Sequence, residues 1–315
     1  MRRHLSNTKV QVALNGGLAI VLLAVALVGG RKFAHNGFAL RHADPLLLTG
    51  ATFLFLIAYA FKAWGWQRLF ADEDRPNVSA LAFAGGAACV GGVALPGRLD
   101  DALRIACVKR FPGVRTGIGA VALSLVVLGL LDNAAIAPLS AVAAASAHSW
   151  TVRLGFVIVA GAGILAAAVV ASLPRIAERS FVMRFRVGRW LASHTFCNRR
   201  AAAALGFISV AWALRATAVF LLLDALSIKG SFTLALAFLC ASAASAALPI
   251  APAGAATQAG AGSAILIASG VHAGDAIAFS VAAQLLVVGT GAVVMLALAG
   301  WHVARRAGAP LPAQA

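Results

Sequence analysis

The sequence is poor in charged residues, which make up only 11% of its 315 residues, and it has a single tyrosine. Hydrophobic residues, in contrast, make up 61% of the chain. Soluble domains contain a smaller share of apolar residues, so the composition argues against a soluble globular protein. It predicts an all-α, polytopic membrane protein whose helices form a bundle.

Residues that bind metals or nucleotides are also sparse or badly spaced. No Gly-Lys-Ser/Thr phosphate loop is present, which argues against a nucleotide-driven motor. The seven histidines fall in or near connections or termini, without the spacing to Glu or Cys that a metal site needs. The cysteines include no close pair and support neither a disulfide framework nor a zinc site: Cys89, Cys107, Cys197 and Cys240. We therefore expect no metal and no cofactor.

Acidic residues are few: the sequence has ten Asp and Glu but 26 Lys and Arg, which gives a net charge of +16. Such a charge can indicate nucleic-acid binding, but here the basic residues lie between hydrophobic segments. They are better explained as topology signals that face anionic lipid headgroups. The strongest signal is the basic loop at residues 174–201, which we expect to be cytoplasmic. No nucleic-acid partner is expected.

The hydrophobic runs predict one membrane domain over residues 1–315, with about seven to eight membrane segments and a tail at 301–315. Ala24-Val25-Ala26 resembles a signal cleavage site, but an uncleaved first helix at 10–28 suits a chain with many later segments. Both termini are then cytoplasmic. The later segments are predicted at 46–66, 79–95, 116–138, 152–173, 202–223, 231–248, 254–269 and 273–300. The stretch 62–68 mixes aromatic and basic residues, which is typical of a membrane interface.

The segment 79–95 is short, rich in glycine, and broken by Pro96-Gly97. It barely reaches the length that crosses the ~30 Å hydrocarbon core, which favours a re-entrant or broken helix. Four charged residues follow the break: Arg98, Asp100, Asp101 and Arg104. Either they form a polar site at membrane depth, or Pro96 simply ends a helix and the charges lie in a wetted loop.

Two further charges lie inside predicted spans. Asp132 costs at least ~2.5 kcal/mol at a helix centre, so it has a function or a partner, or else it lies close to the outer interface. Arg215 lies in the middle of a later span and needs a partner or a water-filled cavity. We expect Asp132 to be that partner.

Residues 81–96 and 235–249 resemble each other, because both are rich in small residues and both end in Leu-Pro. They begin on opposite sides of the membrane in the expected topology. An inverted repeat with broken segments indicates a transport site at the midplane, although alanine-rich sequences also produce chance similarity. After the second Leu-Pro, Pro249, Pro252 and Gly254 leave backbone amides free, and Thr257 and Gln258 add neutral donors. A close helix contact through small residues explains this stretch equally well.

The run from Leu95 to Arg104 resembles the first signature of the bacterial lysylphosphatidylglycerol synthase transmembrane family, also called the flippase-like domain. The stretches 62–68 and 249–260 resemble that family too. The chain departs from the family pattern at Gly92, Gly129 and Gln258-Ala259, where other residues are usual. The synthase members carry a soluble catalytic domain, and we expect none here after residue 300. Aminoacyl transfer is therefore not expected.

The resemblance implies a non-enzymatic translocase of an anionic phospholipid or lipid-linked headgroup in the bacterial cytoplasmic membrane. Arg98 and Arg104 would engage phosphate, while Asp101 and Asp132 would balance charge or bind a cationic group. One alternative is a non-transporting scaffold or partner of an envelope lipid or glycan synthase, tethered through the basic loop. A membrane-embedded transferase is a third alternative with less support, because only Asp100-Asp101 suggests the metal motif that such an enzyme needs.

Overall fold

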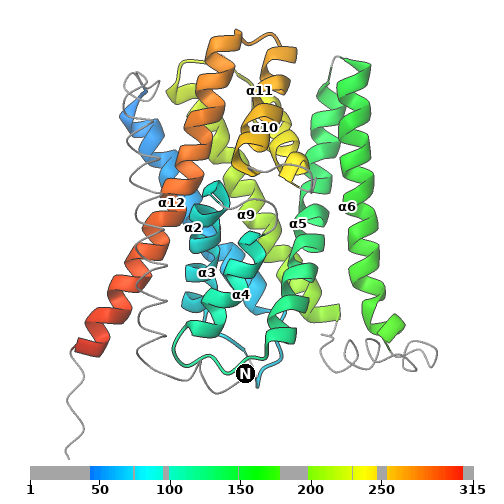
Figure 1. The fold of residues 1–315 in the computed structure, drawn as a ribbon. Coiled ribbons are helices and arrows are strands. Elements are labelled where there is room, and N and C mark those ends of the chain that lie inside the picture. Colours follow the sequence, from blue (N-terminus) through cyan, green and yellow to red (C-terminus); the bar gives the residue numbers. More distant parts are fainter. Residues whose placement is uncertain are drawn as a thin grey trace, which may run out of the picture.

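The computed structural model describes residues 43–73, 75–94, 99–147, 149–177, 198–228, 230–246 and 254–307. Within these ranges the chain forms nine α-helices and no β-strand, which confirms the predicted all-α bundle (Figure 1). The helices are α2 (Pro45–Gln67), α3 (Val78–Ala94), α4 (Leu99–Arg110), α5 (Ile118–Ser146), α6 (Trp150–Ala177), α9 (Asn198–Ala225), α10 (Phe232–Ala246), α11 (Gly254–Ala268) and α12 (Ala273–Ala307).

Five of these helices are long and apolar enough to cross a membrane: α2, α5, α6, α9 and α12. The shortest has 23 residues, which at ~1.5 Å per residue exceeds the ~30 Å hydrocarbon core. The protein is therefore a multi-pass membrane protein. The predicted first segment at 10–28 lies outside the described residues.

The four shorter helices form two hairpins that enter the bundle from opposite ends. The α3–α4 hairpin enters from the lower end in Figure 1, and the α10–α11 hairpin enters from the upper end. The helices of each hairpin meet near the middle of the bundle, as expected for re-entrant segments related by an inverted repeat. The segments predicted as separate spans at 231–248 and 254–269 are instead α10 and α11. Each has 15 residues, too few for a crossing.

Two helices continue past the prolines at which the predicted segments 116–138 and 152–173 stop. α5 passes Pro138 and runs to Ser146, and α6 passes Pro174 and runs to Ala177. A proline removes one backbone hydrogen bond, but α5 packs against α6, α9 and α10. This packing supports the helix on both sides of the missing bond.

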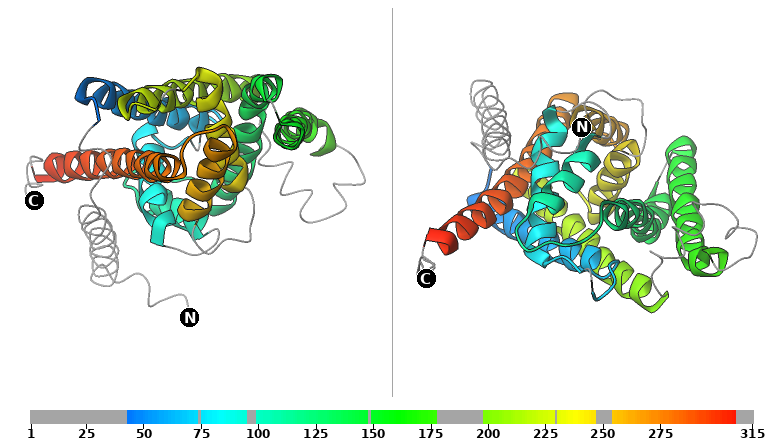
Figure 2. Two further views of the ribbon diagram at one scale, coloured as in Figure 1. Left: turned by 90° about the horizontal axis from the view of Figure 1, so that it is seen from above. Right: turned by 60° about the horizontal axis from the view of Figure 1, so that its bottom comes forward.

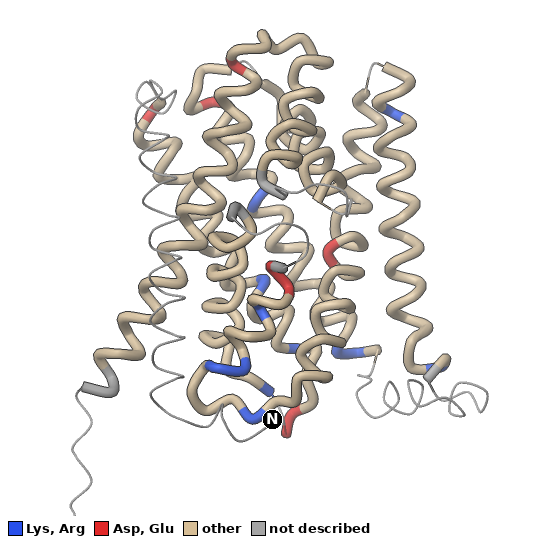
Figure 3. The backbone as a smooth tube through the Cα atoms, in the orientation of Figure 1, with Lys and Arg blue, Asp and Glu red and all other residues tan. Residues whose placement is uncertain are grey.

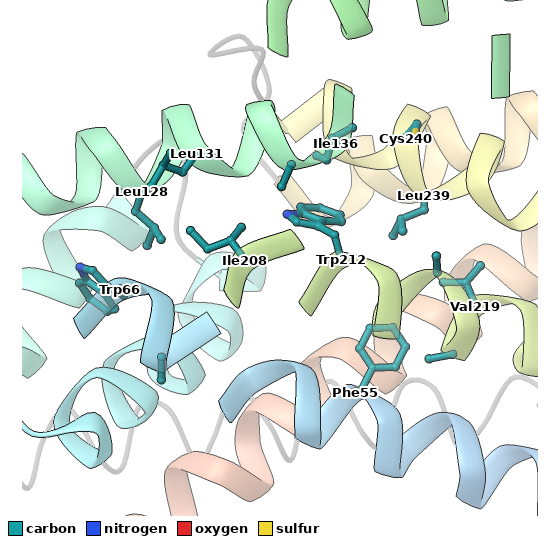
Figure 4. Close-up of a cluster of buried hydrophobic side chains, with 14 of the residues drawn as sticks. Phe55, Trp66, Leu128, Leu131, Ile136, Ile208, Trp212, Val219, Leu239 and Cys240 are labelled. Carbon is teal, nitrogen blue, oxygen red and sulfur yellow. The ribbon is translucent and has the colours of Figure 1, made fainter. Parts of the chain in front are cut away.

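The hydrophobic core includes residues from every described helix, and Figure 4 shows the part contributed by α2, α5, α9 and α10. Gly65 on α2 makes the approach to α9 close, because a Cβ there would lie 2.9 Å from the Ile208 side chain. Trp66 is only 3% exposed and donates from Nε1 to Ser124 Oγ at 2.9 Å. The α6 helix stands at the edge of the bundle, against α5 (Figure 2).

Basic residues gather at the lower end of the bundle, where α2, α4 and α6 end and α5 and α9 begin (Figure 3). Arg200, in the first turn of α9, forms an ion pair with Asp72, which also pairs with Arg75. Arg200 donates to the Phe70 carbonyl at 3.1 Å as well. The connection after α2 is therefore fixed to the start of α9.

Candidate headgroup site

A cavity of about 800 Å³ opens between the two hairpins and the long helices. Its wall includes residues from every described helix except α6. Every described side chain that the sequence singled out for a polar site lines it: Asp100, Asp101, Arg104, Asp132, Arg215, Thr257 and Gln258. The structure thus brings residues from α4, α5, α9 and α11 together around one space.

The charged residues of α4 that line the cavity lie in its first two turns. The Arg104 guanidinium donates to Asp101 Oδ1 at 2.9 Å and lies 3.4 Å from Asp100 Oδ2. The spacings of three and four residues place these side chains on one helix face, where such pairs form. The two acids also lie in the first turn of α4, where the helix dipole favours negative charge. The wall at α4 therefore presents an arginine that two carboxylates already compensate.

Asp132 on α5 is held from two sides. Lys62 Nζ on α2 lies 2.7 Å from its Oδ2, and Trp212 Nε1 on α9 donates to its Oδ1 at 3.0 Å. The expectation that Arg215 would pair with Asp132 is therefore wrong. The indole of Trp212, one helical turn before Arg215, occupies the second carboxylate oxygen, and Lys62 occupies the first.

Arg215 stacks on aromatic rings instead. Its guanidinium carbon lies 5.3 Å from the Trp212 ring centroid and 5.8 Å from that of Tyr59. Such cation–π contacts contribute ~0.5–2 kcal/mol each and leave the hydrogen-bond donors free. Arg215 forms no ion pair with any described residue, and its buried Nε has no hydrogen-bond partner there. It is the one described cation of the cavity without a carboxylate partner.

Three described cations line the cavity: Lys62, Arg104 and Arg215. The α10–α11 hairpin and α12 contribute uncharged groups. Gln284 Nε2 on α12 lies 3.4 Å from Gln258 Oε1, and Ser242 Oγ donates to the Gln258 carbonyl at 3.1 Å. The cavity thus has charged groups of both signs, with Arg215 left unpaired among the described residues, and neutral hydrogen-bonding groups.

Five of the remaining predicted site residues lie outside the described residues: Pro96, Gly97, Arg98, Pro249 and Pro252. Gly254 is the first residue of α11.

Sequence reasoning missed four residues that the structure places in the cavity wall: Tyr59, Lys62, Trp212 and Gln284. Lys62 was assigned to a membrane interface, whereas it points into the cavity and pairs with Asp132. Lys62 lies in an apolar run and Gln284 lies inside the last span. Because polar residues inside spans are costly, both could have been predicted as cavity residues from the sequence.

Comparison with known proteins gives one match. A family model described as the lysylphosphatidylglycerol synthase TM region matches residues 12–298. No curated protein and no solved structure matches the chain. That match covers nearly the whole sequence, and the region it describes is the membrane part of the synthase rather than its catalytic part. The chain belongs to the lysylphosphatidylglycerol synthase TM-region family.

Proposed function

We propose that this protein binds an anionic phospholipid or lipid-linked headgroup in its central cavity and moves it across the bacterial cytoplasmic membrane. The observation that carries the proposal is Arg215, a cation at membrane depth without a carboxylate partner among the described residues. An ionised arginine at a helix centre costs about 2.5–3.5 kcal/mol on insertion scales. A phosphate ligand explains why the chain carries this cost.

The neighbouring groups suit a phosphate that carries further polar groups. Arginine binds phosphate through two parallel hydrogen bonds, and Arg104 lines the same cavity as Arg215. We assign Arg98 to the same role by its place in the sequence motif. Asp101 and Asp132 balance the cations when the cavity is empty and bind any cationic part of the headgroup. Thr257 and Gln258 suit headgroup hydroxyls.

The two hairpins suit transport. Each approaches the middle of the bundle from one end, so that small movements of either hairpin would open the cavity to one side. The basic end of the bundle is assigned to the cytoplasm by the positive-inside rule. Since the sequence has no nucleotide-binding loop, the lipid's own gradient or an ion gradient would drive movement.

The test is reconstitution in liposomes, where transbilayer movement of labelled phosphatidylglycerol is followed. The wild-type protein should accelerate movement, and Arg215→Gln should abolish it while the protein still inserts and folds. The control is Arg153→Gln, which removes an exposed arginine on α6 that donates to the Ala147 carbonyl away from the cavity. It should move lipid at the wild-type rate.

The contrary result is equally clear. If the wild-type protein moves neither phosphatidylglycerol nor aminoacylated or isoprenoid phosphates, the translocase proposal is wrong. The protein would then act as a membrane partner of an envelope lipid or glycan synthase. The basic loop would be the segment to test for binding that enzyme.

A further inference from the structure

Part of the cavity wall on α5 is exposed. Nine residues of α5 line the cavity, and four of them recur on one helix face: Ala122, Val126, Gly129 and Asn133. Val126 is 62% exposed, and a Cβ built at Gly129 would meet nothing within 4 Å. The same surface thus borders the cavity and is exposed.

This exposed face lies within a membrane span, so the medium outside it is lipid rather than water. It runs from Asn133, next to the charged Asp132, toward the basic end of the bundle. The distance along the helix is about 16 Å at ~1.5 Å per residue. Apart from Asn133, the face is apolar. The polar cavity therefore continues into an apolar groove along an exposed face of α5 within the span.

We propose that the groove along Ala122, Val126 and Gly129 holds an acyl chain of the lipid whose anionic headgroup occupies the cavity. This inference rests on the proposed function and assigns a place to the acyl chain of the lipid that it names. The headgroup would leave the bilayer sideways past Gly129, where the missing side chain leaves space. Its phosphate would meet Arg215, while the chain stays in the apolar groove.

Any exposed residue of a membrane span touches lipid, so the test must separate a bound lipid from the surrounding ones. A benzophenone amino acid is placed at Val126 or, as the matched control, at Val157 on α6. Val157 is 52% exposed and lies away from the cavity. Both proteins are irradiated in vesicles of equal parts phosphatidylglycerol and phosphatidylcholine, and the crosslinked lipids are identified by mass spectrometry.

At position 126, phosphatidylglycerol should be enriched over phosphatidylcholine by about tenfold, the ratio for a headgroup contact worth ~1.4 kcal/mol. Arg215→Gln should reduce this ratio to that of the vesicle, although residue 126 itself is unchanged. At position 157, the ratio should follow the vesicle composition with or without Arg215. Equal ratios at the two positions, or an enrichment at 126 that survives Arg215→Gln, would overturn the inference.

A second pair of variants tests the space at Gly129. Gly129→Trp fills the groove, whereas Gly161→Trp adds the same bulk on α6, where a Cβ also meets nothing within 4 Å. Only the first should remove the enrichment at position 126. Because crosslinking reports binding and not movement, enrichment without transbilayer movement would retain this inference and reject the translocase.

Discussion

Lys62 and Asp132 lie 70 residues apart in the sequence and form an ion pair of 2.7 Å in the wall of the central cavity. Their side chains are only 23% and 20% exposed, and the pair connects α2 to α5 in the middle of the bundle. Trp212 donates to the second carboxylate oxygen and joins α9 to the same group. Three long helices therefore meet at one carboxylate.

Removal of one member of this pair should destabilise the protein more than removal of both. Lys62→Met leaves Asp132 without a counter-charge at membrane depth, which should lower the free energy of unfolding by about 1–3 kcal/mol. Lys62→Met combined with Asp132→Asn should recover part of the loss. Thermal melting in detergent measures both.

The control for that experiment is Asp72→Asn. Asp72 is 66% exposed and pairs with Arg75 and Arg200 at the bundle surface, where such pairs contribute ~0–1 kcal/mol. A double variant as unstable as the sum of its two single variants would show that the Lys62–Asp132 contact carries no coupling energy.

The two arginines of the cavity should behave differently when they are neutralised. Arg215→Gln leaves no described carboxylate without its partner, so it should lower the affinity for phosphatidylglycerol by tenfold or more with little change in melting temperature. Arg104→Gln leaves Asp100 and Asp101 as adjacent unpaired acids. It should therefore lower both the affinity for phosphatidylglycerol and the melting temperature. Binding and melting measured on the same preparations separate the two effects. A loss of stability in Arg215→Gln equal to that in Arg104→Gln would contradict this assignment.

Local sequence features predicted the parts of the site that depend on a single helix. The short glycine-rich segment before Pro96 predicted a re-entrant or broken helix, because helix length follows from the chain itself. The alternative that the charges after it lie in a wetted loop remained open. The opposite directions of the two hairpins followed from the basic residues in the connections. These features need no knowledge of how the helices pack.

Contacts between helices were harder to predict from the sequence. The choice of Lys62 over Arg215 as the partner of Asp132 depends on how α2 and α9 are rotated against α5, which no local pattern specifies. The stacking of Arg215 on Trp212 and Tyr59 has the same origin. Pro138 shows the converse, because tertiary packing overrides a local signal that would otherwise end α5.

Gly86 should be indispensable for the contact between α3 and α12. A Cβ at this position would lie 2.5 Å from the Gly291 carbonyl oxygen, which is backbone and cannot rotate away. Gly86→Ala should therefore cost about 1–3 kcal/mol, since the helices must separate. Gly85→Ala is the adjacent control, because a Cβ there meets nothing within 4 Å, and it should be neutral or slightly stabilising. Equal melting temperatures for the two variants would contradict the close approach of α3 and α12.

Gly262 should be needed to hold the α10–α11 hairpin closed. A Cβ there would lie 2.3 Å from the Phe238 ring and 2.7 Å from Ser242 Oγ. Phe238 is buried and packs edge-on against Phe279 with ring centroids 4.9 Å apart, so it has little room to move. Gly262→Ala should push α11 away from α10 and break the hydrogen bond from Ser242 to the Gln258 carbonyl.

The consequence of Gly262→Ala should appear at the cavity, because Thr257 and Gln258 lie about one turn before Gly262 on α11. The variant should lower both the melting temperature and phosphatidylglycerol binding. Gly260→Ala, two residues earlier and open on its Cβ side, should change neither. If Gly262→Ala melts earlier but binds lipid with wild-type affinity, then the position of α11 does not matter to the headgroup, and Thr257 and Gln258 are not part of its site.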